Sequence, residues 1–254
     1  MNNSRSLYYS FLDGIFASIM MGFTMNYIIP FGLILGAKNI HIALLNALPQ
    51  LFGSIVQLKV GEIVDRLKSR LKIITRFVFI HGISYVFIIS LLFVPQNVRI
   101  IWFIILTIIS STATSAAAPA WWSLMSDTVD KDKYGKYFSW RGKVLGFISL
   151  TASFVAGWFL SVVKDKFLGF VVLFFLAGIA RLISGYFISK MDDIEIRILP
   201  EKTFSYFDFV RRIKESNFVK YVFFVSLLNF SVFIAAPFFY VYMLRELKMS
   251  YLEY

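Results

Sequence analysis

Long apolar stretches separated by short clusters of charge dominate the hydrophobic and polar pattern of this chain. A helix of about 20 apolar residues crosses the roughly 30 Å hydrocarbon core of a bilayer. Lipid offers the backbone no hydrogen-bond partner, and the stretches lack the alternating pattern of a barrel strand, so each predicts a transmembrane α-helix. The charge-free runs cover 14–37, 39–58, 77–98, 100–126, 144–163 and 221–244, and a further run, 167–189, is interrupted only by Arg181. We therefore expect an all-α membrane protein with seven spans.

The lengths of the connections divide these helices into two groups. The first six helices follow one another closely on the outer side, as at Lys38–Asn39 and Lys164–Lys166. By contrast, about 30 residues rich in charge follow Lys190 before the seventh helix. This pattern predicts a six-helix N-terminal bundle, a cytoplasmic linker and the first helix of an incomplete C-terminal bundle, at 1–190, 191–216 and 217–254.

The predicted linker carries a local helix signal. Ser205 and Asp208 have the spacing of a capping box. Apolar residues that follow fall on one face of a helix, opposite Arg211, Arg212 and Lys214. A short amphipathic helix at the membrane interface is expected here, with an irregular loop as the alternative.

Lysine and arginine are distributed unevenly between the two sides. Assigning successive loops to alternate sides places about 18 of the 26 Lys and Arg on the side of the N-terminus. Cytoplasmic loops carry such an excess, so the N-terminus is predicted to lie in the cytoplasm of a multi-pass cell-membrane protein. The opposite side holds only Lys38, Arg99, Lys164, Lys166, Arg245 and Lys248.

Composition excludes several classes of protein. A hydrophobic content of 58% and a mean hydropathy of +0.72 are higher, and a charged fraction of 16% is lower, than is usual for a soluble domain. The net charge of +11 would suggest nucleic acid in a soluble protein, but here the basic residues lie between apolar runs, where they set topology and contact lipid headgroups. With no cysteine and two isolated histidines, neither a metal site nor a cofactor is expected.

The connection between the second and third helices carries a motif. Gly61, Asp65, Arg66 and Arg70 resemble the GxxxDRxGRK signature of the major facilitator superfamily, with Lys68 in place of the second glycine. A glycine allows helices to approach closely, a carboxylate stabilises a helix N-terminus, and arginines bind phosphate or carboxylate. The alternative is a plain positive-inside cluster.

A second motif follows the fourth helix. Asp127, Gly135 and Arg141, preceded by Trp121 and Trp122, are similar to a PxWxSLxxD and RGxYFxxR pattern of permeases in the same superfamily, with Tyr134 in place of the arginine. The tryptophans also suit an interfacial aromatic belt. The resemblance implies a cytoplasmic latch formed by Gly61, Asp65, Arg66, Arg70, Asp127, Gly135 and Arg141.

The resemblance also implies an architecture. Two similar loops at the ends of the second and fourth helices fit a bundle built from inverted repeats. A superfamily permease has about twelve helices, so the chain is expected to be a truncated or partial transporter, or one that pairs with a second half-transporter chain or with its own copy.

Charged residues inside the predicted spans are expensive to bury and are therefore candidate functional residues. Asp13 and Arg181 fall in the same half of the bilayer, which predicts a buried ion pair or a proton-linked switch. Lys59 and Glu62 lie near a helix end and can reach the interface.

Neutral polar residues near the middle of the spans are candidates to line a solute cavity. Their alternative role is hydrogen bonding between helices. His41 and His81 are interpreted as packing or interfacial residues, because neither has a titratable neighbour in sequence. The candidate cavity residues are Asn26, Tyr27, Gln50, Thr114, Thr151 and Asn229.

Competing functions have less support. Asp127 and Asp130 have a DxxD spacing, but Lys131 stands where the membrane phosphotransferase pattern requires glycine, and no GxSxG or HExxH motif occurs, so no enzyme is predicted. A seven-helix receptor would have its N-terminus outside, and this class, or a non-transporting assembly partner, is the alternative. The sequence favours a secondary active transporter of a small solute working by alternating access in the lipid bilayer, with proton coupling as an option.

Overall fold

The computed structural model describes residues 3–194, 211 and 215–253. The side chains of Asp65 and Arg66 are not among those described. The short helix expected around Ser205 and Asp208 lies outside the described residues.

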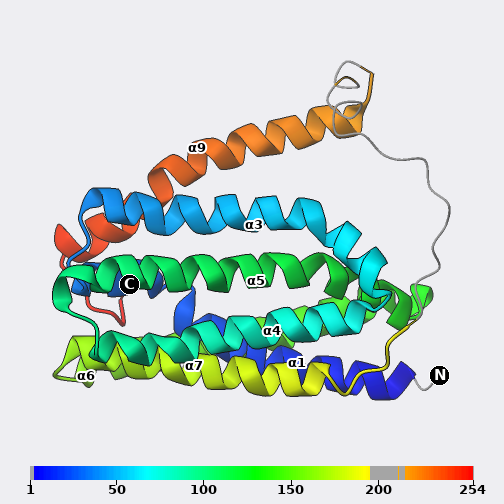
Figure 1. Cartoon of the computed structure of the whole chain (residues 1–254), viewed down its shortest axis with the longest axis horizontal. Helices are drawn as coiled ribbons and strands as arrows, with labels where there is room; N and C mark the ends of the chain where they lie inside the picture. The colour runs from blue at the N-terminus through cyan, green and yellow to red at the C-terminus, as the bar shows by residue number, and fades with distance from the viewer. Residues whose placement is uncertain (1–2, 195–210, 212–214, 254) are drawn as a thin grey trace.

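Helices alone make up the secondary structure of the described residues. They form seven spans that are long and apolar enough to cross a membrane. This confirms the all-α prediction and the seven spans. Figure 1 shows the helices lying side by side along the long axis of the molecule. The α-helices are α1 (Asn3–Thr24), α2 (Ile28–Ile34), α3 (Asn39–Leu67), α4 (Arg70–Val86), α5 (Arg99–Thr128), α6 (Tyr134–Val162), α7 (Lys166–Ile188) and α9 (Asn217–Arg245). The 3-10 helices are η1 (Phe87–Leu92), η2 (Gln96–Val98) and η3 (Lys131–Lys133).

The two ends of the bundle are named here by their distance from the N-terminus. The proximal end holds the start of α1 and the α3–α4 and α5–α6 connections, and the distal end holds the α2–α3, α4–α5 and α6–α7 connections (Figure 1). Several helices extend past their charge-free runs toward the proximal end. The Ser69 side chain caps α4 by accepting from the Lys72 amide, and α6 begins at Tyr134. Arg70 and Arg141 are therefore helical residues rather than loop residues.

The first span is broken into α1 and α2 by a turn at Met25–Tyr27. Pro30 accounts for the break, because a proline has no amide hydrogen and its ring collides with the carbonyl four residues earlier. The expectation that Asn26 and Tyr27 lie within a continuous helix is therefore wrong. The Tyr27 hydroxyl donates instead to the Ser153 carbonyl on α6, at 2.8 Å.

The α3–α4 connection forms a tight turn at Lys68, the residue that replaces a glycine of the superfamily signature. Lys68 is left-handed, with φ +49° and ψ +25°, and its amide donates to the Val64 carbonyl at 2.9 Å. A residue with a β-carbon is strained in this region by about 1 kcal/mol. The turn therefore forms without the glycine.

Two apolar cores hold the first six spans together. In the distal core, Phe31 of α2 stacks on Phe170 of α7 at 5.1 Å and meets Phe103 of α5 edge-on at 4.9 Å. The proximal core centres on Leu124 and Met125 of α5. The polar site described below lies on helices shared by both cores.

Helix α9 lies along the outside of this bundle (Figure 1). Among its residues, Val219 and Pro237 are the buried ones. Its distal end is fixed, because Arg245 donates to the Ala37 carbonyl at 3.1 Å and Tyr251 packs against Phe170 at 5.4 Å. Most of the apolar surface of α9 is consequently available to other partners or to lipid.

Candidate functional site

A cavity of about 540 Å³ lies between α1, α3, α4 and α5. Methionines of α1 and tryptophans of α5 give it a mainly apolar wall. The side chains of Met25, Gln50 and Trp122 are both exposed and part of the lining, so the cavity is open to its surroundings. Its volume falls in the range of about 300–1,000 Å³ that small-molecule sites occupy.

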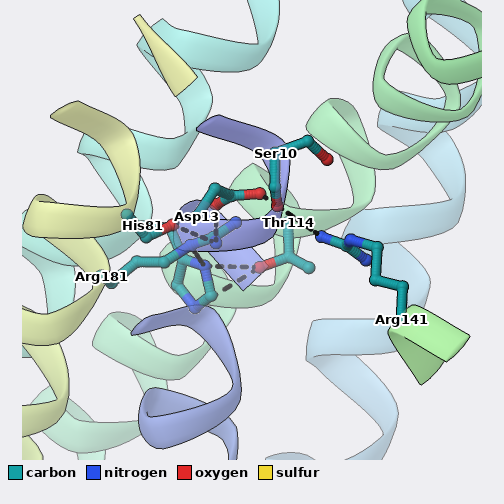
Figure 2. Close-up of polar contacts among 7 residues, drawn as sticks. Ser10, Asp13, His81, Thr114, Arg141 and Arg181 are labelled. Carbon is teal, nitrogen blue, oxygen red and sulfur yellow. Dashed lines mark hydrogen bonds and ion pairs between the residues drawn. The ribbon is translucent and has the colours of Figure 1, made fainter. Parts of the chain in front are cut away.

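The carboxylate of Asp13 lies at the centre of a polar cluster in the cavity wall (Figure 2). It is buried on α1, with Arg181 of α7 near one oxygen and Arg141 of α6 near the other, each at 3.8 Å. The closest hydrogen bond comes from Ser184, whose hydroxyl donates to Asp13 Oδ1 at 2.6 Å. One carboxylate is thus shared between two guanidinium groups on different helices.

Arg181 is well supplied with partners. Its Nη1 donates to the Ser184 hydroxyl at 2.9 Å, and its Nε donates to His81 Nδ1 at 3.2 Å. A ring nitrogen that accepts this bond carries no proton, so the arrangement assigns His81 as neutral with its hydrogen on Nε2. Thr114 on α5 completes this side of the cluster, with its hydroxyl 2.9 Å from the same His81 nitrogen (Figure 2).

Arg141 has a different set of partners, which includes a side-chain hydrogen bond with Tyr137. Its Nη2 donates to the Ser10 carbonyl at 3.0 Å, and its guanidinium lies 4.8 Å from the ring of Trp121, which lines the cavity. Its Nε is buried without a hydrogen-bond partner among the described residues, as is the Ser10 hydroxyl. Arg141 therefore lines the cavity and holds one buried donor, its Nε, without a partner among the described residues.

The structure separates the six candidate cavity residues into two groups. Gln50 and Thr114 line the cavity, and the other four do not. Asn26 and Tyr27 contact Ser153 because the α1–α2 break turns them toward α6. Thr151 and Asn229 are exposed on α6 and α9 away from the cavity.

The two motif segments meet through Arg70 at the start of α4 and Asp127 near the end of α5, which form an ion pair at 2.7 Å. Arg70 also donates to the carbonyl and hydroxyl of Ser123 and to the Ile194 carbonyl. Asp193, which sequence reasoning did not single out, accepts from the Ser69 hydroxyl and from the Leu71 amide at the start of α4. These contacts join α4, α5 and the segment after α7 into one proximal clamp.

Among the other latch residues that the structure fully describes, Gly61, Gly135 and Arg141 do not take part in this clamp. Arg141 contacts the Asp13 cluster instead, because α6 begins early and carries it away from the loop. A β-carbon at Gly61 or Gly135 would meet no described atom within 4 Å, so neither glycine permits a close helix approach among the described residues. Asp65 and Arg66 lie on α3, and their side chains are not described.

The remaining charged candidates have ordinary partners. Lys59 and Glu62 form an exposed ion pair at 3.1 Å. Asp130 pairs with Lys133 at 3.0 Å, and Asp127 pairs with Arg70, so the two carboxylates of the DxxD spacing are each engaged by a cation. Across the described residues, no three potential ligands gather to hold a metal.

Sequence reasoning does not bring His81, Arg141 or Ser184 to Asp13, although Ser184 makes the closest hydrogen bond to its carboxylate. The sequence pattern favours a packing role for His81, although an ionisable residue in the middle of a span is itself a signal of a functional site. The charge-free run of α6 starts only after Lys143, so the hydropathy pattern predicts a loop position for Arg141.

Comparison with known proteins agrees with this architecture. Residues 11–252 match the MFS_1 like family, which confirms the likeness to the major facilitator superfamily. Searches of the curated proteins and of the solved structures gave no match. The chain therefore belongs to the MFS_1 like family and is a multi-pass membrane protein of the transporter type.

Proposed function

We propose that the protein is a secondary active transporter that carries a small solute across the cell membrane by alternating access, with the cavity between α1, α3, α4 and α5 as its solute site. Residues 1–190 form the first bundle and α9 the first helix of a second bundle in this proposal. The family match supports transport in general, and the cavity gives the proposal a place for the solute.

The observation that best supports this function is a cluster of buried charges, inside the spans, beside an open cavity. Asp13, Arg141 and Arg181 come from three helices, α1, α6 and α7. A buried ion pair is weak evidence for stability, since desolvation offsets much of its attraction. Charges inside a membrane protein commonly mark a solute or ion pathway.

The helices beside the cavity contain features that suit movement. Pro49 lies inside α3 and Pro119 inside α5, and α1 is interrupted at Met25–Tyr27. Prolines are the usual cause of sharp bends in helices. We propose that these helices rock against the second bundle, so that the cavity opens to each side of the membrane in turn.

The proposed orientation places the proximal end in the cytoplasm, because the basic residues of the α3–α4 and α5–α6 connections lie there. The natural chain has no cysteine, so single cysteines at Lys131 and Gln96 report orientation without further changes. Both residues are exposed, at the proximal and distal ends respectively. In intact cells an impermeant maleimide should label Gln96→Cys and spare Lys131→Cys, and the reverse result would place the N-terminus outside.

Alternating access is tested by the same chemistry at the cavity. Gln50→Cys should react with an impermeant reagent in right-side-out and in inside-out vesicles, because the cavity visits both sides. Ile109→Cys is a matched control, since Ile109 lies at mid-span on α5, is exposed and does not line the cavity. Labelling of Gln50→Cys from one side alone would contradict alternating access.

Proton coupling is tested at Asp13. Solute uptake into proteoliposomes should be driven by an imposed pH gradient, and Asp13→Asn should abolish that dependence if the Asp13 cluster is a proton-linked switch. Uptake by Asp13→Asn that still follows the gradient would leave Asp13 and Arg181 as a static ion pair.

A further inference from the structure

The formal charges that line the cavity do not balance. Asp13 supplies one carboxylate, and Arg141 and Arg181 supply two guanidinium groups. His81 is neutral in its observed hydrogen bonding. Within the described part of the chain, the cavity lining therefore carries an excess of one positive charge.

Of the two guanidinium groups, Arg141 is the one with a buried donor that has no partner among the described residues. Arg181 is engaged by Asp13, Ser184 and His81, which together use its Nε and one terminal nitrogen. Arg141 lies at the same 3.8 Å from Asp13 and bonds the Ser10 carbonyl and Tyr137, but its buried Nε has no partner in the described part of the chain. A buried donor without a partner is costly, so a ligand whose binding turns the Arg141 guanidinium toward it removes that cost.

The surroundings of Arg141 define the rest of the ligand. Trp121 lies under the guanidinium, and Met20 and Met21 line the same cavity. Aromatic rings and flexible methionine side chains accommodate apolar groups of varied shape. A hydrophilic ion would leave this wall without complementary contacts.

We propose that the cavity selects a small amphipathic organic anion, whose carboxylate binds Arg141 and whose apolar part lies against Trp121 and the α1 methionines. This assignment rests on the proposed function, because it names the class of solute that the same site would carry. A planar guanidinium binds a carboxylate through two parallel hydrogen bonds, which gives direction as well as charge. An organic cation would face two arginines against one carboxylate and should be rejected.

The test compares three probes of the same shape: 3-phenylpropionate, 3-phenylpropionamide and 3-phenylpropylamine. Binding to the purified full chain in detergent is measured by titration calorimetry. The carboxylate should bind saturably, at least about tenfold more tightly than the amide or the amine, because only it pairs with the excess charge. Equal affinity for the three probes, or preference for the amine, would overturn the proposal.

Variants separate a binding role of Arg141 from a structural one. Arg141→Gln should weaken 3-phenylpropionate binding by about tenfold or more, and Arg141→Lys should keep part of it. Arg76→Gln removes the same charge from an exposed position on α4 outside the cavity and should leave binding unchanged. If Arg141→Gln bound as tightly as Arg76→Gln, the assignment of the carboxylate to Arg141 would be wrong.

Asp13→Asn should change the binding affinity in the opposite direction to Arg141→Gln. A gain in affinity cannot result from a general loss of folding. Removing this carboxylate should strengthen 3-phenylpropionate binding, because the ligand no longer competes with Asp13 for Arg141. Weaker binding by a folded Asp13→Asn protein would overturn the proposal. A lipid headgroup is the alternative ligand. If phosphatidylglycerol displaced bound 3-phenylpropionate and small carboxylates did not, the site would be assigned to a lipid headgroup and the proposal would be overturned.

Uptake into proteoliposomes distinguishes this inference from the proposed function. Uptake of labelled 3-phenylpropionate supports both. Saturable binding without uptake under any imposed gradient keeps the anion site and contradicts transport of this probe by the chain. Uptake of the amine alone keeps the transporter and overturns the anion assignment.

Discussion

The proximal clamp and the Asp13 cluster use the same chemistry at different depths. In the clamp, Arg70 and Asp127 are 2.7 Å apart, and about half of the Asp127 side chain is exposed. In the cluster, the Asp13 side chain is only 5% exposed, and it lies 3.8 Å from each of two arginines. A short pair with one hydrated partner fixes two helices together, whereas a buried carboxylate shared between two helices responds when either helix moves. The burial of the carboxylate and the number of arginines that share it therefore distinguish the clamp from the candidate switch.

The largest effect is expected at Asp13. Asp13→Asn leaves two buried guanidinium groups without a carboxylate and should lower the free energy of unfolding by about 3 kcal/mol. Arg181→Gln should cost less, because Asp13 and Arg141 remain as a neutral pair. Thermal unfolding of the purified variants in detergent measures both. An Arg181→Gln protein less stable than Asp13→Asn would show that hydrogen bonds to Ser184 and His81 outweigh charge balance.

The clamp should show an asymmetry between its two partners. Arg70→Gln loses the ion pair and the hydrogen bonds to Ser123 and Ile194, and should destabilise the protein by about 2 kcal/mol. Asp127→Asn should cost less than about 1 kcal/mol, because the carboxylate is half exposed and screened by water. Equal losses, measured by the same unfolding assay, would mean that the ion pair itself carries the clamp.

A smaller change of opposite sign is expected at the turn beside the clamp. Lys68→Gly should stabilise the protein by about 0.5–1 kcal/mol, because glycine adopts the left-handed conformation without strain. Lys143→Gly removes an exposed lysine from the interior of α6 and serves as the control. It should destabilise by about 1 kcal/mol, since glycine is a poor helix residue. A loss of stability in Lys68→Gly would show that the lysine side chain supports the turn.

The smallest effect is expected at candidate residues that lie away from the cavity. Thr151→Ala removes a hydroxyl that donates to the Phe147 carbonyl of its own helix, and stability should change by no more than about 0.5 kcal/mol. Uptake of 3-phenylpropionate should also be unchanged. Gln50→Ala alters the cavity wall and should change uptake, so similar uptake by the two variants would contradict the position of the solute site.

The spans could be predicted because hydrocarbon imposes a length and a composition on every helix. Their ends could not, since α4 and α6 continue through charged residues that hydropathy treats as loop. That error separated Arg141 from the Asp13 cluster. Asp13 and Arg181 were singled out because burial of charge in lipid is costly, and the structure places them 3.8 Å apart. A neutral polar residue lines the cavity only if its helix is rotated to turn it inward. The sequence around Gln50 and around Thr151 does not show this rotation, so the two could not be told apart.

The break in the first span has a consequence for how force passes along it. Phe31 anchors α2 in the distal aromatic core, while Asp13 sits on α1, beyond the turn at Met25–Tyr27. If the first span were one continuous helix, any tilt of the half that carries Asp13 would also move Phe31. Because the helix is interrupted at Met25–Tyr27, a tilt at Asp13 is not carried rigidly to Phe31.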